Sequence, residues 1–276
     1  MADVLVLPDY VKPPVVEVVC GVIFEPLPLL TTAHMGLLWQ RFKDTYSHCK
    51  ETQPLSPVIE NFGDPQSAPQ FPLSISGLPS FLLPRIWFER PDARGLIQVQ
   101  KDRFHHNWKK AEETDEYPHY KHVFDNFKNY LESFESFLSE NHLGSVTPLQ
   151  YEMTYVNHIP QGEGWNSSET IHEIFPDLDW RRNPDRFLPS FEQINLSWAF
   201  VLPDKSGRLH MTISRGVRVK DQRPLLVFNI TARGIGNDRS RAAMWRWFDI
   251  AHEWIVRGFT DVTGEEVQRN IWKRIS

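Results

Sequence analysis

The residues best suited to chemistry in this chain are gathered in one stretch, residues 96–110, which reads LIQVQKDRFHHNWKK. An ordinary half-buried strand separates apolar from polar residues with a period of two. Here Gln, Asp, Arg, His, Asn and Trp occupy both odd and even positions. The pattern predicts one long strand that either projects into water or lines a polar interior. We expect Gln98, Gln100 and Asp102 to be internal polar partners, and residues 103–110 to extend beyond a covering helix as a contact surface.

Basic and aromatic side chains at the end of this strand form a candidate binding surface. Interleaved Arg, Lys and Trp can contact phosphates and stack on bases, and the same residue types anchor protein interfaces. The net charge of −5 favours a protein partner or a small ligand over nucleic acid. The residues that we predict to bind are Arg103, His105, Asn107, Trp108, Lys109, Glu152, His158 and Arg233.

Arg233 belongs to a short glycine-containing segment, ARGIG at residues 232–236. The segment follows a predicted strand and precedes a predicted helix, a position at which backbone N–H groups can hold an anion. Its spacing matches neither GxGxxG nor GxxxxGK[ST]. A plain strand-to-helix turn is the favoured interpretation.

An alternative function is a metal-dependent hydrolase or nuclease that uses Asp102, His105 or His106, Glu152 and His158. Glu152 and His158 have the same parity in their strand, so both can face one cavity. However, adjacent histidines on a strand point to opposite faces, and a zinc site needs three or four converging ligands. The chain has no HxH or HExxH spacing. We therefore expect neither a metal site nor a cofactor.

Periodicity predicts an alternation of strands and helices along the chain. A β-branched run at residues 15–24 predicts a buried strand, and apolar residues at helical spacing predict long helices at 120–140 and 239–257. The remaining expected elements are a helix at 31–46, a loop at 51–84, strands at 85–90, 96–110, 149–159, 194–202, 209–219 and 224–233, and a helical piece at 169–175.

The order of these elements indicates an internal duplication. Residues 1–147 and 148–276 each read as strand, helix, hairpin and long helix, with one extra strand in the second half. We expect one integrated α+β domain, in which the two halves form a curved antiparallel sheet with both long helices on one face. The first strand of each half is expected near the middle. A small-ligand cavity between the helices and the sheet is a further alternative function.

Composition limits the cellular setting. The two cysteines, Cys20 and Cys49, form no CxxC motif, which favours a reducing compartment. The first residues lack the features of a signal peptide, and no apolar run approaches the ~18 residues of a membrane helix. We expect a cytoplasmic protein without a membrane anchor.

Five segments carry a resemblance: PPVVEVVCGVIF, HMGLLW, LIQVQKDRFHHNW, LQYEMTYVNHI and FDIAHEWIVRGFTDVT. They are similar, in order and over nearly the whole chain, to a sporadically distributed, uncharacterised prokaryotic family of about this length. The resemblance implies no catalytic residue or cofactor. Its patchy distribution fits genes of mobile, defence or toxin–antitoxin type loci. Together with the absence of a catalytic motif, this favours a non-enzymatic binding or accessory protein.

Overall fold

The computed structural model describes residues 6–56, 58–62, 83–179, 185 and 187–276. Within these residues, nine strands form one antiparallel sheet in the order β2-β3-β4-β5-β1-β6-β9-β8-β7. The strands are β1 (Val15–Phe24), β2 (His48–Thr52), β3 (Arg85–Glu89), β4 (Gly95–Gln100), β5 (Arg103–Lys109), β6 (Pro148–Pro160), β7 (Asn195–Val201), β8 (Arg208–Val217) and β9 (Pro224–Gly234). The helices are α1 (Thr32–Phe42), α2 (His119–Glu140), α3 (Arg241–Val262) and α4 (Glu265–Asn270), with short 3-10 turns η1 (Ser168–Glu173) and η2 (Pro203–Lys205). The α+β class is as predicted.

The first strand of each half lies in the middle of the sheet, as predicted. β1 and β6 pair antiparallel, with Cys20 opposite Met153 and Val22 opposite Tyr151. β5 flanks β1 and β9 flanks β6. Because β1 is hydrogen-bonded along both edges and its C-terminal half is buried, it needs the nearly continuous apolar sequence that marked it as a strand.

The stretch 96–110 is two strands, so the prediction of one long strand was wrong. β4 and β5 are joined by a tight turn at residues 101–102. Gln98 lies directly opposite His105 across this hairpin. Even positions before the turn therefore share a side of the sheet with odd positions after it. This switch of parity explains why polar residues occupied both faces of the imagined single strand.

The extra strand belongs to the first half and not to the second, which corrects the expected strand count. Residues 1–147 contain β1–β5, whereas 148–276 contain β6–β9. The sequence prediction missed two strands of the first half. It treated β4 and β5 as one strand, and it did not identify β2, whose sequence is HCKET. β2 is an exposed edge strand, where charged side chains are normal and apolar alternation is absent. Most of the expected loop at 51–84 lies outside the described residues.

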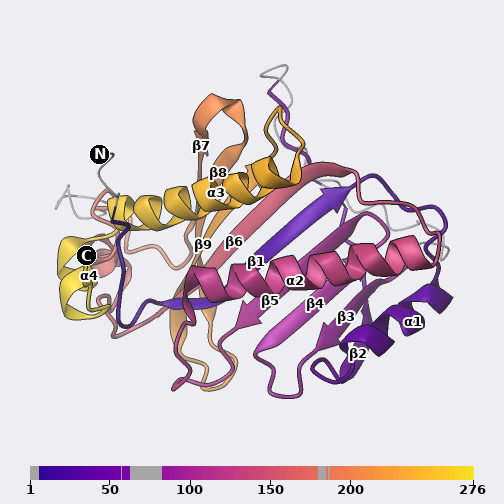
Figure 1. Ribbon diagram of the computed structural model, residues 1–276. Helices are drawn as coiled ribbons and strands as arrows, with labels where there is room; N and C mark the ends of the chain where they lie inside the picture. The colour runs from indigo at the N-terminus through magenta and orange to yellow at the C-terminus, as the bar shows by residue number, and fades with distance from the viewer. Residues whose placement is uncertain (1–5, 57, 63–82, 180–184, 186) are drawn as a thin grey trace.

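The two long helices rest on different strands of the sheet (Figure 1). α2 packs on β5 and β1, and α3 packs on β6, β9 and β8. Phe134 of α2 stacks on Phe104 of β5 with ring centroids 5.2 Å apart. Phe248 of α3 lies 5.1 Å from Phe127 of α2 and 5.8 Å from Tyr151 of β6. These aromatic contacts join residues of both halves in one buried apolar cluster.

Candidate functional site

A row of mostly polar side chains crosses seven neighbouring strands on one side of the sheet. Residues directly opposite each other in paired strands point to the same side. The successive partners, named here the central row, are Trp87, Gln98, His105, Gly21, Glu152, Arg233 and Arg208. We call the side of the sheet that carries this row the polar face. Its residues come from distant parts of the chain, and only the register of the sheet brings them together.

Gly21 makes room for His105 at the centre of this row. A Cβ atom built on Gly21 would lie 1.8 Å from Cδ2 of His105, so the imidazole ring lies directly over the β1 backbone. The ring thereby reaches across β1, and its Nε2 is 3.4 Å from Oε2 of Glu152 on β6. The backbone of Gly21 does not adopt a left-handed conformation. Close approach is therefore the reason for glycine here.

Substituting Gly21 with alanine is expected to displace the His105 ring and to break its contact with Glu152. Inserting one methyl group into a filled site typically costs about 1–3 kcal/mol. We expect a loss of this size in the free energy of unfolding measured with urea. Gly36, where an added Cβ meets nothing within 4 Å, supplies the control. Gly36→Ala lies inside helix α1 and should be neutral or stabilising. Equal stability of Gly21→Ala and the native protein would contradict the packing argument.

Glu152 is the acidic member of a group that we call the polar centre: Arg103, His105, Glu152 and Arg233. Nε of Arg233 is 2.9 Å from Oε1 of Glu152. Burial by itself raises the pKa of Glu152, but His105, Arg233 and Arg103 together lower it below its usual value. The carboxylate is therefore ionised and holds positively charged neighbours in place.

Positive charge is in excess around the polar centre. Arg103 is 3% exposed, and its Nε lies 3.3 Å from Oδ1 of Asp102. Arg85 of β3 donates to the side chains of Thr52 and Gln98. Burial and the nearby charge of Arg103 lower the pKa of Arg85. Among the described residues, Arg85, Arg103 and Arg233 thus face the two carboxylates of Asp102 and Glu152 at close range.

Several buried N–H groups on the polar face have no acceptor. Among the described residues, Nε1 of Trp87 and Nη2 of Arg103 are buried and make no hydrogen bond. Nε2 of His105 and Nε of Arg233 also make none, although both lie close to Glu152. Buried polar groups are normally hydrogen-bonded, and an unpaired one costs about 1–3 kcal/mol. Nε1 of Trp87 and Nη2 of Arg103 therefore lack an acceptor, whereas Nε of Arg233 already has Oε1 of Glu152 at 2.9 Å. An anion would supply acceptors to the first two groups.

Residues 53–56 and 58–62 lie across the polar face and are held there by the side-chain amides of Gln100 and Gln150. Gln100 exchanges two hydrogen bonds with the backbone of Leu55, at 2.8 and 3.0 Å. Gln150 accepts from the N–H of Glu60 at 2.8 Å and donates to the carbonyl of Val58 at 2.7 Å. The side-chain amides of Gln100 and Gln150 thus pair with backbone groups, as the backbone of a neighbouring strand would. They explain how buried amides can be satisfied on an otherwise open sheet face.

Glu60 anchors the far end of this segment to β8. Its carboxylate lies 2.6 Å from Nη1 of Arg208 and 2.5 Å from Nε2 of His210. Burial opposes ionisation of Glu60, yet hydrogen bonds from His210 and Arg208 lower its pKa. Residues 53–56 and 58–62 therefore contact the polar face from Gln100 of β4 to Arg208 and His210 of β8.

The structure brings together four of the predicted binding residues, Arg103, His105, Glu152 and Arg233. They are buried or partly buried, and Arg103 and His105 are 3% and 5% exposed. The prediction of a contact surface is therefore wrong for residues 103–107, which are buried, whereas residues 108–110 are partly exposed. The cause is the turn at 101–102, which folds β5 back into the middle of the sheet instead of letting it extend.

The other predicted residues lie apart from this group. Asn107 is buried on the polar face and bonds Gln98 and Glu17. Trp108 points to the opposite side and packs on Tyr117. Lys109 lies at the end of β5. His158 lies near the end of β6, six positions from Glu152. At the rise of a strand these two residues are about 20 Å apart.

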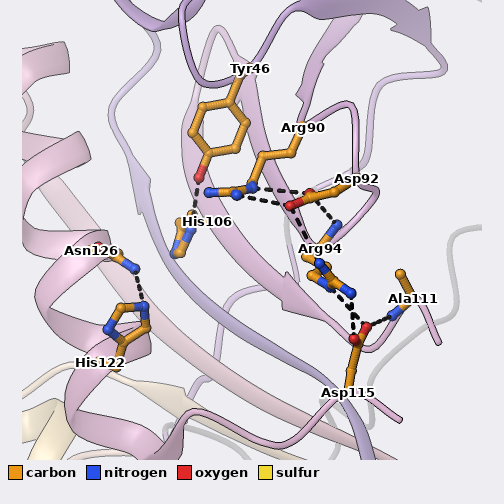
Figure 2. Close-up of polar contacts among 9 residues, drawn as sticks. All are labelled: Tyr46, Arg90, Asp92, Arg94, His106, Ala111, Asp115, His122 and Asn126. Carbon is orange, nitrogen blue, oxygen red and sulfur yellow. Dashed lines mark hydrogen bonds and ion pairs between the residues drawn. The ribbon is translucent and has the colours of Figure 1, made fainter. Parts of the chain in front are cut away.

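His106 is a core residue and not part of the polar face. It lies under Tyr130 of α2 and forms a 3.2 Å hydrogen bond with the hydroxyl of Tyr46. Burial lowers the pKa of His106 to about 3, and the charges of His122 and Arg90 act in the same direction. Figure 2 shows Tyr46 above His106, with His122 on the neighbouring helix. His105 and His106 therefore cannot serve one metal ion, as their adjacency predicts.

A second group in Figure 2 fixes the turn between β3 and β4. Arg94 donates two hydrogen bonds to the carboxylate of Asp115, at 3.0 and 2.6 Å. The backbone N–H groups of Ala111 and Glu112 donate to the same carboxylate. These donors hold the pKa of Asp115 well below its usual value, with Arg94 as the largest cause. The bonds tie the acidic linker after β5 to the hairpin, which is a structural task.

Comparison with protein-family models, with curated proteins and with solved structures finds no match to the chain. In the parts of the chain that the structure describes, no three or more His, Cys, Asp or Glu residues are arranged to hold a metal ion. None of the described helices is long and apolar enough to cross a membrane. The arrangement of the polar face is therefore the basis for a functional proposal.

Among the residues of the site, the sequence did not single out Gly21, Arg85, Trp87 and Arg208. One signal was present, because the apolar residues Ile97 and Val99 fall on odd positions, whereas Phe104 and Trp108 fall on even positions. This switch indicates a two-residue turn and would have placed Gln98 with His105. Nothing in the sequence pairs Gly21 with either His105 or Glu152.

Proposed function

We propose that this is a non-enzymatic binding protein that takes an anionic group, a phosphate or a carboxylate of a ligand or partner, at the polar centre. The observation that carries the proposal is the unpaired Nη2 of Arg103, buried between strands of the sheet. A guanidinium group bonds phosphate and carboxylate in a planar, two-pronged geometry. An anion beside Arg103 would supply the acceptor that is lacking.

Two further features support an anion over a neutral ligand. Arg103 is buried and Arg85 partly buried, and burial together with the charge of Arg103 lowers the pKa of Arg85. An anion between the two guanidinium groups would attract both. Nε1 of Trp87, which can only donate, also lacks an acceptor. The cytoplasmic location and the link to mobile or defence loci remain predictions, and neither is needed for the proposal.

We also propose that the sheet arose by duplication, with both long helices on the side opposite the polar face. The two halves of the sheet mirror each other: β5, β4 and β3 follow outward from β1 as β9, β8 and β7 follow outward from β6. Each meander leads into a long helix, α2 or α3. In this view β2 is an addition to the first half, and the polar centre straddles the junction.

Inorganic phosphate is the simplest probe of this proposal. Thermal melts of the native protein in rising phosphate, against sodium chloride of equal ionic strength, are expected to shift upward. Binding to the folded state alone contributes about 2.7 kcal/mol at a concentration 100 times Kd, which is several degrees for a chain of this size. Acetate at equal ionic strength separates a preference for carboxylate from one for phosphate.

Two arginine variants provide the comparison. Arg103→Gln is expected to lose most of the phosphate-dependent shift, since a hydrogen bond to a charged group contributes about 1.5–3 kcal/mol. Arg239→Gln removes the same charge from an exposed arginine and should keep the shift. An equal shift in both variants, or no shift in the native protein with either anion, would overturn the proposal.

A further inference from the structure

A cavity of about 300 Å³ lies between the two long helices, the sheet and the N-terminal segment. This volume is at the lower end of the range for small-molecule sites. Its lining is mostly apolar and aromatic, and it comes from α2, α3, β6 and β9 together with residues 7–15. The lining residues that carry the argument are Tyr117, Tyr120, Tyr155, His252 and Val256. None of them belongs to the polar centre.

The cavity wall contains a chain of hydrogen bonds that can present either a donor or an acceptor. The hydroxyl groups of Tyr117 and Tyr155 are 2.7 Å apart, and that of Tyr155 is 3.1 Å from Nδ1 of His252. Each hydroxyl can donate or accept, and His252 can adopt either tautomer. The direction of these hydrogen bonds can therefore reverse, so that they offer either a donor or an acceptor to the polar group of a ligand.

These polar groups are uncharged around neutral pH. Burial lowers the pKa of His252 to about 4, and it raises the pKa of Tyr117 and of Tyr155. The cavity is also lined by Asp9, Lys121 and the imidazole of His119, and Asp9 and His119 approach to 3.7 Å. A charged ligand inside would find no partner among the tyrosines and His252, so the cavity favours a neutral one.

The N-terminal side of the cavity shows features of a built site. His119, the first residue of α2, has a φ of +61°, an uncommon conformation for a residue other than glycine. Strained backbone of this kind concentrates at ligand sites and clamps. The ring of Tyr120 stacks on His252 at 4.0 Å and so closes one wall. Residues 7–10 and 13–15 contribute another wall and lie over the apolar interior.

We infer that this cavity is a second binding site, for a small neutral molecule with an aromatic or otherwise flat apolar body and one hydrogen-bonding group. The body would pack between the aromatic walls. Its polar group would hydrogen-bond with the side chains of Tyr117, Tyr155 or His252. The site is independent of the anion at the polar centre.

The probe for this site is N-phenyl-1-naphthylamine, a neutral aromatic amine whose fluorescence rises in apolar surroundings. The native protein is expected to bind it saturably with one site. Val256→Phe places a larger side chain into the cavity and should weaken binding at least tenfold. Leu37→Phe, on the exposed face of α1, adds similar bulk outside the cavity and should leave binding unchanged.

Val256→Leu is a graded substitution that keeps the test informative if Val256→Phe does not fold. It should give an intermediate affinity, and thermal melts of each variant report folding separately. Binding of the same strength in the native protein and in both Val256 variants would place the probe elsewhere, for instance on exposed Trp198 and Phe200 of β7. That result, or no saturable binding by the native protein, would overturn the inference.

Discussion

Glu152→Gln is expected to lower the free energy of unfolding by about 3–5 kcal/mol, the cost of leaving buried charge uncompensated. The substitution keeps the shape of the side chain but removes the negative charge that faces Arg233 and His105. It leaves Arg103 with Asp102 as its close carboxylate in the part of the chain that the structure describes. Urea unfolding at pH 7, fitted to two states, measures the change.

The control for this change is Glu132→Gln on the exposed side of α2. An exposed carboxylate without an ion pair contributes little, and we expect a change within about 0.5 kcal/mol. Combining Glu152→Gln with Arg233→Gln should recover part of the loss, because the double variant removes an unpaired cation together with its partner. If Glu152→Gln were as stable as Glu132→Gln, the buried ion network would not contribute to the free energy of unfolding.

Acid is expected to destabilise the protein through its buried histidines, and His106 has the larger shift. Its pKa is about 3 in the folded protein against about 6.5 in the unfolded chain. Between these values the unfolded chain binds one more proton, so the free energy of unfolding falls by about 1.4 kcal/mol for each unit of pH lost. Stability is therefore fully present above pH 6.5 and declines toward pH 3, a total of about 4–5 kcal/mol.

His106→Phe removes this proton linkage. The slope of unfolding free energy against pH, measured with urea between pH 6 and 4, should become shallower by about 1.4 kcal/mol per unit. The hydroxyl of Tyr46 loses its partner, so absolute stability also changes, but the slope isolates the titration. His48→Phe, at an exposed edge position, serves as the control. An unchanged slope in His106→Phe would show that His106 is protonated in the folded protein.

The sequence predicted the parts of the fold where apolar periodicity is strong. β1, α2 and α3 follow from the run at 15–24 and from the aromatic stripes at 120–140 and 239–257, because each must bury one face or both. The position of β1 beside β6 followed from the matched order of elements. These features depend on local pattern, which a single sequence carries.

The features that could not be predicted depend on weak turn signals or on distant pairing. Lys101 and Asp102 are not among the dipeptides that mark a two-residue hairpin, such as Asn-Gly, so the division of 96–110 rests on a parity switch alone. β2 is a polar edge strand without a buried face, so its sequence shows no alternation of apolar and polar residues. The polar centre requires the register of β5, β1, β6 and β9, and Gly21 of β1 precedes Arg233 of β9 by about 210 positions.

The most direct test of the anion proposal is a crystal structure with selenate, a tetrahedral dianion, measured at the selenium absorption edge. The proposal predicts an anomalous peak within hydrogen-bond distance of Nη2 of Arg103, and its loss in Arg103→Gln crystals. An ordered Arg103 side chain with no peak beside it, in crystals that bind selenate elsewhere, would contradict an anion site at the polar centre.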